Sequence, residues 1–346
     1  MSDRRTFLKK VGTLGALTTL YPYRLWAGGF STPERILPRR LKKGDTIALV
    51  TPGSPITEEQ LSVAVRSLEE KGFKAVYQDS VLSEYGYFAG PDQERADELM
   101  EMFSRRDVDA IWCVRGGYGS IRILDLLDYD LIRRHPKIFM GYSDITALIT
   151  AIFQLTGLVC FHGPLGVTDL NRFSLRSISR ILMDPRERYA YPYRREKQSR
   201  ANPEFDRYTI TPGKAEGMLT GGNVSVLDSM IGTRYEADFE EKIAYLEEVG
   251  EKTYRVDKMV YHLLSATNLK KANGIVMGIF SDCSGRDEAS LSLQKALDDL
   301  LRPLGIPVSY GLSFGHIQRM ITLPTGIRAA LDAQKNRLSL LEPAVL

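Results

Sequence analysis

The feature that most constrains the fold is an alternation of short apolar runs and helix-like stretches between residues 45 and 185. In Glu58–Lys71, for example, apolar residues recur at i, i+3, i+4 and i+7, the spacing of an amphipathic helix. Alternating strands and helices favour an α/β fold, a parallel sheet with helices on both faces. In such a sheet the loops after the strands gather at one edge, where ligands bind. The predicted strands are Thr46–Thr51, Phe73–Tyr77, Ala110–Val114, Ile138–Tyr142 and Leu158–Phe161, and the predicted helices are Glu58–Lys71, Asp92–Arg105, Ile121–Leu127 and Ile145–Leu155.

A second region of alternating elements follows a segment of different composition. Residues 186–213 are rich in Arg, Tyr, Pro, Gln and Ser without an apolar period, so they are predicted to be a linker. Because 346 residues exceed one ordinary core, we expect an N-terminal domain over residues 28–185 and a C-terminal domain over 214–346. The strands predicted after the linker are Gly217–Leu219, Ile243–Leu246, Gly274–Phe280 and Pro307–Tyr310, and the helices are one ending at Met230, Arg255–Leu264 and Leu291–Leu301.

Residues 1–27 are predicted to be an export signal. Arg4-Arg5 precedes Phe7-Leu8-Lys9 and a mild apolar stretch, Val11–Leu20, an order that resembles a twin-arginine leader. The apolar stretch is too short to span a bilayer comfortably, since about 20 residues are needed. We therefore expect a periplasmic protein without stable membrane insertion after processing, or a cytoplasmic one if the leader is not functional. An uncleaved anchor or a plain basic tail is the alternative.

Charge and cysteine content exclude several functions. The 46 basic and 43 acidic residues give a net charge of +3, too balanced to predict nucleic-acid binding. Three cysteines without paired spacing do not indicate a disulfide framework. Cys113 and Cys160 lie in apolar runs and are expected to pack as small hydrophobic residues, whereas Cys283, in a polar loop, is the one thiol whose position suggests reactivity.

The segment Gly141-Tyr-Ser-Asp-Ile-Thr146 carries the strongest chemical signal. It places Ser143 on a sharp turn from a strand into a helix, where the hydroxyl stands clear of the sheet beside free N–H groups. A serine in such a turn is suited to attack a carbonyl. Nearby in the predicted crevice, Arg115-Gly-Gly-Tyr-Gly119 lacks the spacing of a dinucleotide-binding loop. Its glycines fit an oxyanion hole, and an ordinary tight turn is the alternative.

A nucleophilic serine requires a base and an orienting carboxylate. Of the four histidines, His162 and His316 each follow a strand and adjoin glycine, and the residues alone leave this choice open. Glu247 and Glu248 end the strand Ile243–Leu246, and strand alternation puts them on opposite faces, so only one can serve. No histidine has a partner at i+4 or an acid at metal-ligand spacing, so we expect no metal and favour serine chemistry over zinc.

Taken in order, these motifs resemble the serine LD-carboxypeptidases, a family that includes murein tetrapeptide carboxypeptidases and microcin C immunity hydrolases. The resemblance covers residues 45 to 341. The motifs are Val114-Arg-Gly-Gly-Tyr-Gly119, Gly141-Tyr-Ser-Asp-Ile-Thr146, Phe161-His-Gly-Pro164, Gly221-Gly-Asn223, Leu246-Glu-Glu-Val249 with Tyr254-Arg-Val-Asp257, and Gly315-His316.

The resemblance implies both a fold and a site. It implies an N-terminal domain like class I glutamine amidotransferases and a smaller C-terminal domain of swivelling β/β/α type, without a cofactor and as a homodimer. Its catalytic triad is Ser143, His316 and Glu247, with the backbone N–H groups of Asp144 and Gly117 as the oxyanion hole.

The implied reaction is removal of the terminal D-alanine from a murein tetrapeptide, at the bond after diaminopimelate. Arg115, Asn223 and Arg319 are the expected substrate-binding residues, because arginine suits a free carboxylate. Hydrolysis of a microcin-like peptide-nucleotide is the nearest alternative and would require an aromatic stacking group, for which Tyr189, Tyr191 and Tyr193 are available. The third possible function is that of a non-catalytic protein that binds wall peptides.

Overall fold

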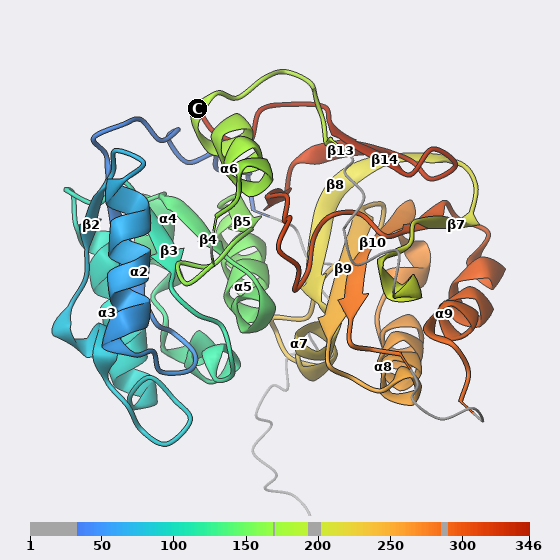
Figure 1. Ribbon diagram of the computed structural model, residues 1–346, viewed down its shortest axis with the longest axis horizontal. Coiled ribbons are helices and arrows are strands. Elements are labelled where there is room, and N and C mark those ends of the chain that lie inside the picture. Colours follow the sequence, from blue (N-terminus) through green and yellow to red (C-terminus); the bar gives the residue numbers. More distant parts are fainter. Residues whose placement is uncertain (1–32, 169, 193–201, 285–289) are drawn as a thin grey trace, which may run out of the picture. The chain divides into compact units, whose positions relative to one another are not determined.

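The computed structural model describes residues 33–168, 170–192, 202–284 and 290–346 (Figure 1). The predicted export signal lies outside these residues. Within them, no helix is both long enough and apolar enough to cross a membrane.

The first of two sheets confirms the predicted parallel α/β arrangement. Its six strands lie in the order β12-β5-β4-β3-β1-β2, and all but one run parallel. The exception, β12, comes from near the C-terminus and pairs antiparallel with β5 at the sheet edge. This three-residue strand has no local signal in the sequence, because its pairing is long-range. The strands are β1 (Thr46–Val50), β2 (Lys74–Val76), β3 (Ala110–Cys113), β4 (Ile138–Gly141), β5 (Cys160–His162) and β12 (Leu323–Thr325).

Helices cover both faces of this sheet because its strands are apolar on both sides. Ile47 and Leu49 of β1 pack in one core with α2, whereas Ala48 and Val50 pack in another with α3 and α5. The expected helix at Ile121–Leu127 is a 3-10 helix, Ser120–Leu126. The α-helices of this half are α2 (Glu58–Glu69), α3 (Asp92–Ser104), α4 (Tyr129–Arg134), α5 (Thr146–Thr156) and α6 (Arg172–Ile178).

The second sheet has eight strands in the order β6-β14-β13-β8-β9-β10-β11-β7. The central strands β8 to β11 run parallel, and the outer strands pair antiparallel. Helices α7, α8 and α9 pack in one core with β9 and β10. The elements are β6 (Tyr189–Ala190), β7 (Tyr208–Thr211), β8 (Lys214–Asn223), β9 (Ile243–Val249), β10 (Gly274–Ser281), β11 (Val308–Tyr310), β13 (Arg328–Asp332), β14 (Arg337–Leu340), α7 (Val224–Ser229), α8 (Thr253–Ala266) and α9 (Leu293–Leu301).

The two halves share a hydrophobic core. One cluster of buried side chains contains Leu49 and Trp112 of the first sheet together with Leu219, Tyr245 and Val276 of the second. The segment predicted to be a linker supplies both β6 and β7 to the edges of the second sheet. The boundaries of the two domains stay a prediction.

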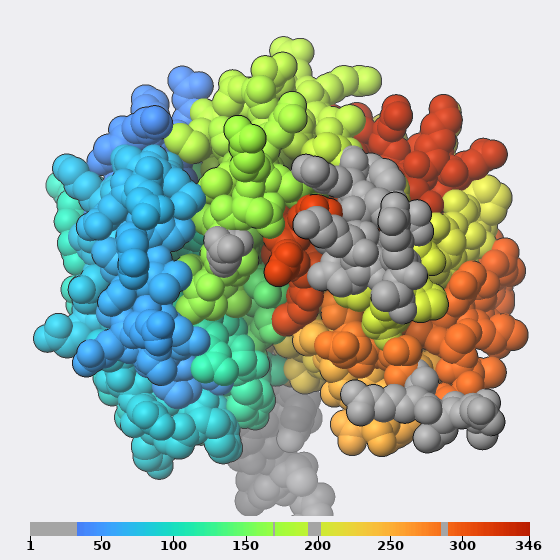
Figure 2. Space-filling view, in the orientation of Figure 1, coloured from blue at the N-terminus to red at the C-terminus, as the bar shows by residue number. Residues whose placement is uncertain are grey.

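The segment that follows β11 returns to the first half of the chain. In the space-filling view, its orange-red atoms lie directly against the green segment that contains α6 (Figure 2). Hydrogen bonds join them: Asn171 donates to the carbonyl of Gln318, and the N–H groups of Met320 and Thr322 donate to Ser174 Oγ and Ser177 Oγ. This return carries His316 toward the first sheet.

Candidate active site

The turn after β4 holds Ser143 in a conformation that non-glycine residues rarely adopt. Its φ is +64°, in the left-handed region, and it opens a 3-10 turn, Ser143–Ile145, that leads into α5. Such a backbone costs on the order of 1–3 kcal/mol and persists only where the surroundings enforce it. A strained turn between strand and helix is the setting expected for a nucleophile.

Three predicted catalytic side chains form a continuous hydrogen-bonded chain. His316 Nε2 lies 3.1 Å from Ser143 Oγ, and His316 Nδ1 lies 2.9 Å from Glu247 Oε2. If Nδ1–H donates to the carboxylate, Nε2 is left to accept from the serine hydroxyl. Gly315 permits this approach: its φ is +114°, and a Cβ there would lie 2.7 Å from the carbonyl oxygen of Ile279.

Charge and burial act against each other within this chain. Burial alone raises the pKa of Glu247, but the charge of His316 and its hydrogen bond outweigh burial and leave that pKa below its usual value. For His316, burial lowers the pKa, while the charge and hydrogen bond of Glu247 more than offset it and leave the pKa raised. The pair therefore favours an imidazolium next to a carboxylate.

The other candidate base, His162, lies in a different environment. It is fully buried on β5, and its ring packs at 5.8 Å from Tyr142, 5.4 Å from Tyr245 and 6.1 Å from Phe314, centroid to centroid. Burial lowers the pKa of His162 to about 4 despite the charge of Glu247. It is therefore a neutral packing residue, and within the described parts of the chain neither of its ring nitrogens makes a hydrogen bond.

Glu248 points away from the histidine, as strand alternation predicts. Its carboxylate accepts from Asn223 Nδ2 at 3.1 Å and from the N–H of Ser225 at 2.7 Å, at the start of α7. Asn223 is itself buried and caps α7 by accepting from the N–H of Val226. The structure thus gives both residues structural contacts, and substrate binding by Asn223 stays a prediction.

The glycine loop after β3 lies against the nucleophile. A Cβ on Gly116 would lie 3.1 Å from Ser143 Cβ and 3.3 Å from the N of Asp144. Gly117, with φ +86°, is packed on Ser54, where an added Cβ would lie 2.3 Å from Oγ. The buried carboxylate of Asp144 accepts from the N–H of Ser120 at 2.8 Å and so ties the loop to the nucleophile turn. The oxyanion hole formed by the N–H groups of Asp144 and Gly117 stays a prediction.

Arg95 is a supporting residue that the sequence reasoning missed. Its side chain is 1% exposed, and it donates to the carbonyls of Pro52, Gly90 and Gly119 and to Asp92. It thereby fixes the loop after β1 against the glycine loop. The signal was present in α3, where a charged residue occupies the apolar stripe next to Ala96 and Leu99.

A hollow of about 390 Å³ adjoins the triad. Its lining residues are Tyr142, Thr168, Asn171, Phe205, His316, Ile317 and Gln318. Arg319 follows this wall and is partly buried, whereas the exposed Arg115 donates to the carbonyl of Pro55 at 2.8 Å. Tyr142, whose ring lies 4.8 Å from that of His316, was not predicted as a site residue.

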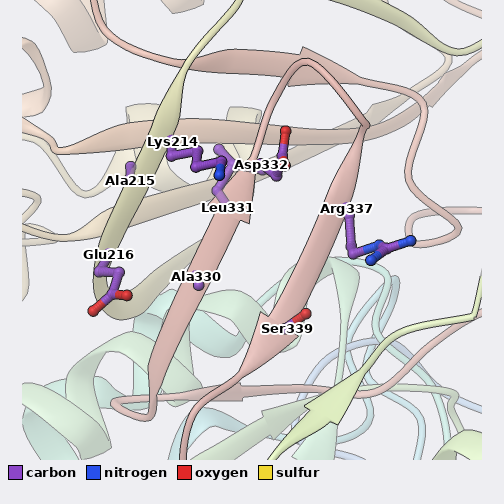
Figure 3. A pocket seen from close by; sticks show the side chains of 8 residues that line it. All are labelled: Lys214, Ala215, Glu216, Ala330, Leu331, Asp332, Arg337 and Ser339. Atoms are coloured by element: carbon purple, nitrogen blue, oxygen red, sulfur yellow. The ribbon is translucent and has the colours of Figure 1, made fainter.

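Two other features concern ligand binding: a second hollow, and the capacity of the described chain to bind a metal ion. A hollow of about 210 Å³ lies over β8, β13 and β14, where Lys214, Glu216, Asp332 and Arg337 mix both charges (Figure 3). Its lining includes no triad residue. In the described parts of the chain, no group of three His, Cys, Asp or Glu side chains could hold a metal ion.

Cys283, the one cysteine whose sequence position suggested reactivity, does not lie in a reactive environment. All three cysteines are buried, and burial raises the pKa of Cys283 to about 12. The polar residues around it suggested exposure, but Cys283 packs in the apolar core with α8 and α9. A protonated, buried thiol is a poor nucleophile.

Comparison with known proteins identifies the family. The family model described as the LD-carboxypeptidase N-terminal domain matches residues 47–163, and the LD-carboxypeptidase C-terminal domain matches residues 216–331. The chain belongs to the LD-carboxypeptidase family. Because this is a family of serine peptidases, the protein is a hydrolase.

Relatives cover nearly all of the described chain. A probable murein peptide carboxypeptidase of Bacillus subtilis is 38% identical over 302 residues, which are 85% of this chain and 91% of the relative. Among solved structures, wild-type apo microcin C7 self-immunity protein MccF superimposes with a TM-score of 0.81 at 26% identity, over 90% of this chain and 100% of that one. Muramoyltetrapeptide carboxypeptidase from Oxalobacter formigenes superimposes with a TM-score of 0.73 at 29% identity, over 85% of this chain and 97% of that one.

Proposed function

We propose that this LD-carboxypeptidase removes the terminal D-alanine from murein tetrapeptides, cutting the bond after diaminopimelate with a Ser-His-Glu triad. The observation that carries the proposal is the hydrogen-bonded chain from Ser143 through His316 to Glu247, beside a hollow of about 390 Å³. The relatives named as murein peptide and muramoyltetrapeptide carboxypeptidases support the class of substrate.

The proposed acylation begins at Ser143. As its Oγ attacks the scissile carbonyl carbon, His316 Nε2 takes the hydroxyl proton. The backbone N–H groups of Asp144 and Gly117 stabilise the oxyanion that forms. The C–N bond then breaks, and His316 gives its proton to the departing amine of D-alanine.

Deacylation reverses these roles. A water molecule attacks the acyl-enzyme ester while His316 accepts its proton, and the tetrahedral intermediate releases the tripeptide carboxylate as Ser143 regains its proton. Glu247 keeps the imidazole oriented and stabilises its charged form in both half-reactions.

An exopeptidase must also hold the free carboxylate of the leaving residue. Arg115, next to the glycine loop, and Arg319, next to the triad histidine, are proposed for this role, with Asn223 as a further contact. We also propose that the protein is exported to the periplasm, where it would remodel wall peptides. We further propose that it forms a homodimer. Fractionation that recovers the full-length chain only from the cytosol would reject export.

A defined tetrapeptide tests the proposed reaction. Wild-type protein should release D-alanine and leave the tripeptide, detected by mass spectrometry. Ser143→Ala should be slower by about three orders of magnitude or more, because the nucleophile is lost. Ser265→Ala, at an exposed serine of α8, is the matched control and should keep full activity. Unchanged turnover in Ser143→Ala rejects the nucleophile, and no release by wild type rejects the substrate.

A peptide-nucleotide substrate is the second candidate, supported by the likeness to microcin C7 self-immunity protein MccF. Of the tyrosines considered for stacking, Tyr191 is buried and donates to the carbonyl of Thr322, and Tyr189 packs against it. Tyr193 lies outside the described residues. Phe205 and Tyr142 instead present aromatic rings to the hollow. Assaying a peptidyl-adenylate analogue beside the tetrapeptide separates the two candidates by their kcat/KM values.

A further inference from the structure

Three exposed tyrosines gather beside the glycine loop. Tyr85 and Tyr87 are each 64% exposed and Tyr118 is 51% exposed, although large hydrophobic side chains are mostly buried in this protein. The rings of Tyr87 and Tyr118 lie 5.9 Å apart, and both pack on buried Phe88, at 4.4 Å and 5.7 Å. We call these three tyrosines the tyrosine platform.

The platform is rigidly attached to the catalytic loops. Tyr118 directly follows Gly117, and its N–H donates to Ser54 Oγ at 3.1 Å. Tyr85 and Phe88 bridge to each other through two backbone hydrogen bonds, and the N–H of Ala89 donates to the carbonyl of Gly53. Arg95 donates to the carbonyls of Pro52 and Gly119, so the backbone of the loops that carry the platform is tied together.

Ionic side chains lie along the same surface. Arg122 stacks over the ring of Phe88 at 4.6 Å and pairs with Asp92 at 2.7 Å, with roughly half of the Arg122 side chain exposed. Pyranose sugars bind to exposed aromatic faces that lie beside hydrogen-bonding groups. The C–H groups of the sugar ring pack on the aromatic face, and the sugar hydroxyls form hydrogen bonds with the charged side chains. Clustered aromatic exposure of this kind marks an interaction site.

We propose that the tyrosine platform binds the amino sugar to which the peptide of a murein substrate is attached. This inference rests on the proposed function and extends it from the peptide to the glycan. Three amino acids separate that sugar from the scissile carbonyl, and three extended residues alone span about 10 Å. Tyr118 is two residues beyond Gly116, a chain length of at most about 7 Å, and an added Cβ on Gly116 would lie 3.1 Å from Ser143 Cβ. The ring of Tyr87 lies 5.9 Å from that of Tyr118, so the platform begins next to the nucleophile turn.

The test compares two substrates, the free tetrapeptide and the same peptide on its disaccharide. For wild type, the disaccharide form should have the higher kcat/KM. In Tyr87→Ala, the ratio of kcat/KM for the disaccharide form to that for the free peptide should fall about tenfold, as expected for one lost aromatic contact. Tyr261→Ala, at a tyrosine of α8 that is 61% exposed, is the matched control and should keep the wild-type ratio.

A second measurement does not depend on turnover. Titration of the Ser143→Ala protein with the disaccharide alone, followed by NMR, should show saturable binding that is lost when Tyr87→Ala is added. No binding, or equal losses on both substrates, overturns the proposal. So does a Tyr87→Ala protein that dissociates from dimer to monomer in sedimentation, since a second copy would then cover the platform.

These outcomes separate the two proposals. If wild type releases D-alanine from the free peptide but the ratio is insensitive to Tyr87, only the glycan site fails. If no D-alanine is released from either substrate, the proposed function fails, and sugar binding is still measured by the titration.

Discussion

At the scale of single residues, the site depends on a carboxylate kept charged inside the core. Glu247 is fully buried, where an unpaired charge is costly, yet His316 supplies an opposite charge and a hydrogen bond at 2.9 Å. The same pairing raises the pKa of His316. His162, on β5 of the first sheet, has no hydrogen-bonding partner among the described residues, and burial keeps it neutral instead. Two histidines of equal promise in the sequence therefore have opposite electrostatic properties.

The raised pKa of His316 predicts the pH profile of the enzyme. Because the base must be neutral to accept the serine proton, kcat/KM should rise with pH through an apparent pKa above the ordinary histidine value of about 6.5. Glu247→Gln removes the charge that favours imidazolium, so the rising limb should move to lower pH while the rate falls at least about 100-fold. Measuring kcat/KM from pH 5 to 9 for both proteins checks this. A rising limb at the same pH in both would contradict the assignment.

At the scale of elements, α3 shows how a regular pattern can carry a charge into the core. Its apolar stripe also contains Arg95 and Glu98, both buried. Glu98 accepts hydrogen bonds from the N–H of Thr51 at 3.1 Å and from Ser80 Oγ at 3.0 Å. Thr51 begins the loop that follows β1. Burial raises the pKa of Glu98 to about 7, and these two hydrogen bonds only partly oppose it.

Glu98 should make stability depend on pH. Between its ordinary value of about 4.5 and its folded value of about 7, the folded state holds more protons than the unfolded state. The contribution of Glu98 to the free energy of unfolding is therefore fully present below pH 4.5. It is lost as the pH rises through 7, and the total loss is about 3 kcal/mol. Glu98→Gln keeps the shape without the ionisation.

The measurement is the difference in free energy of unfolding between Glu98→Gln and wild type, from denaturant titrations at pH 4.5 to 8.5. As the pH rises, the free energy of unfolding of Glu98→Gln should increase relative to that of wild type. Taking the difference cancels other titrating groups, including His162. A constant difference across this range would show that Glu98 is ionised throughout.

At the scale of the whole molecule, the triad is assembled across the two sheets. The backbone of Asn223, at the end of β8, donates to Thr146 Oγ1 at 3.0 Å, just after the nucleophile turn. Tyr245 of β9 is hydrogen-bonded to Thr325 of β12 at 2.6 Å, within the buried core. Such contacts fix the second sheet, which bears Glu247, against the first, which bears Ser143.

Gly222→Ala should disturb this alignment. An added Cβ would lie 2.4 Å from Thr146 Cγ2, and the φ of +146° also disfavours a side chain. We expect kcat to fall at least about tenfold, because a shift of about 1 Å at the triad is enough for larger losses. Gly232→Ala, with φ +78° and no atom within 4 Å of the added Cβ, has the backbone cost alone and is the control. Full activity in Gly222→Ala, or equal loss in both, would show that this contact does not align the triad.

What the sequence determined by itself was local. Periodicity located β1 and α2 closely, and the motif around Ser143 identified a strained turn, because both depend on residues near one another in the chain. The residues by themselves left the choice between His162 and His316 open, and the tertiary structure is what brings His316 to Ser143 and places Glu247 rather than Glu248 beside the histidine. It also brought β12 into the first sheet and buried Cys283. These outcomes depend on contacts between distant segments, and the histidine that meets Ser143 lies 173 residues along the chain. No pattern of neighbouring residues records such a contact, since it exists only once both sheets have formed and packed.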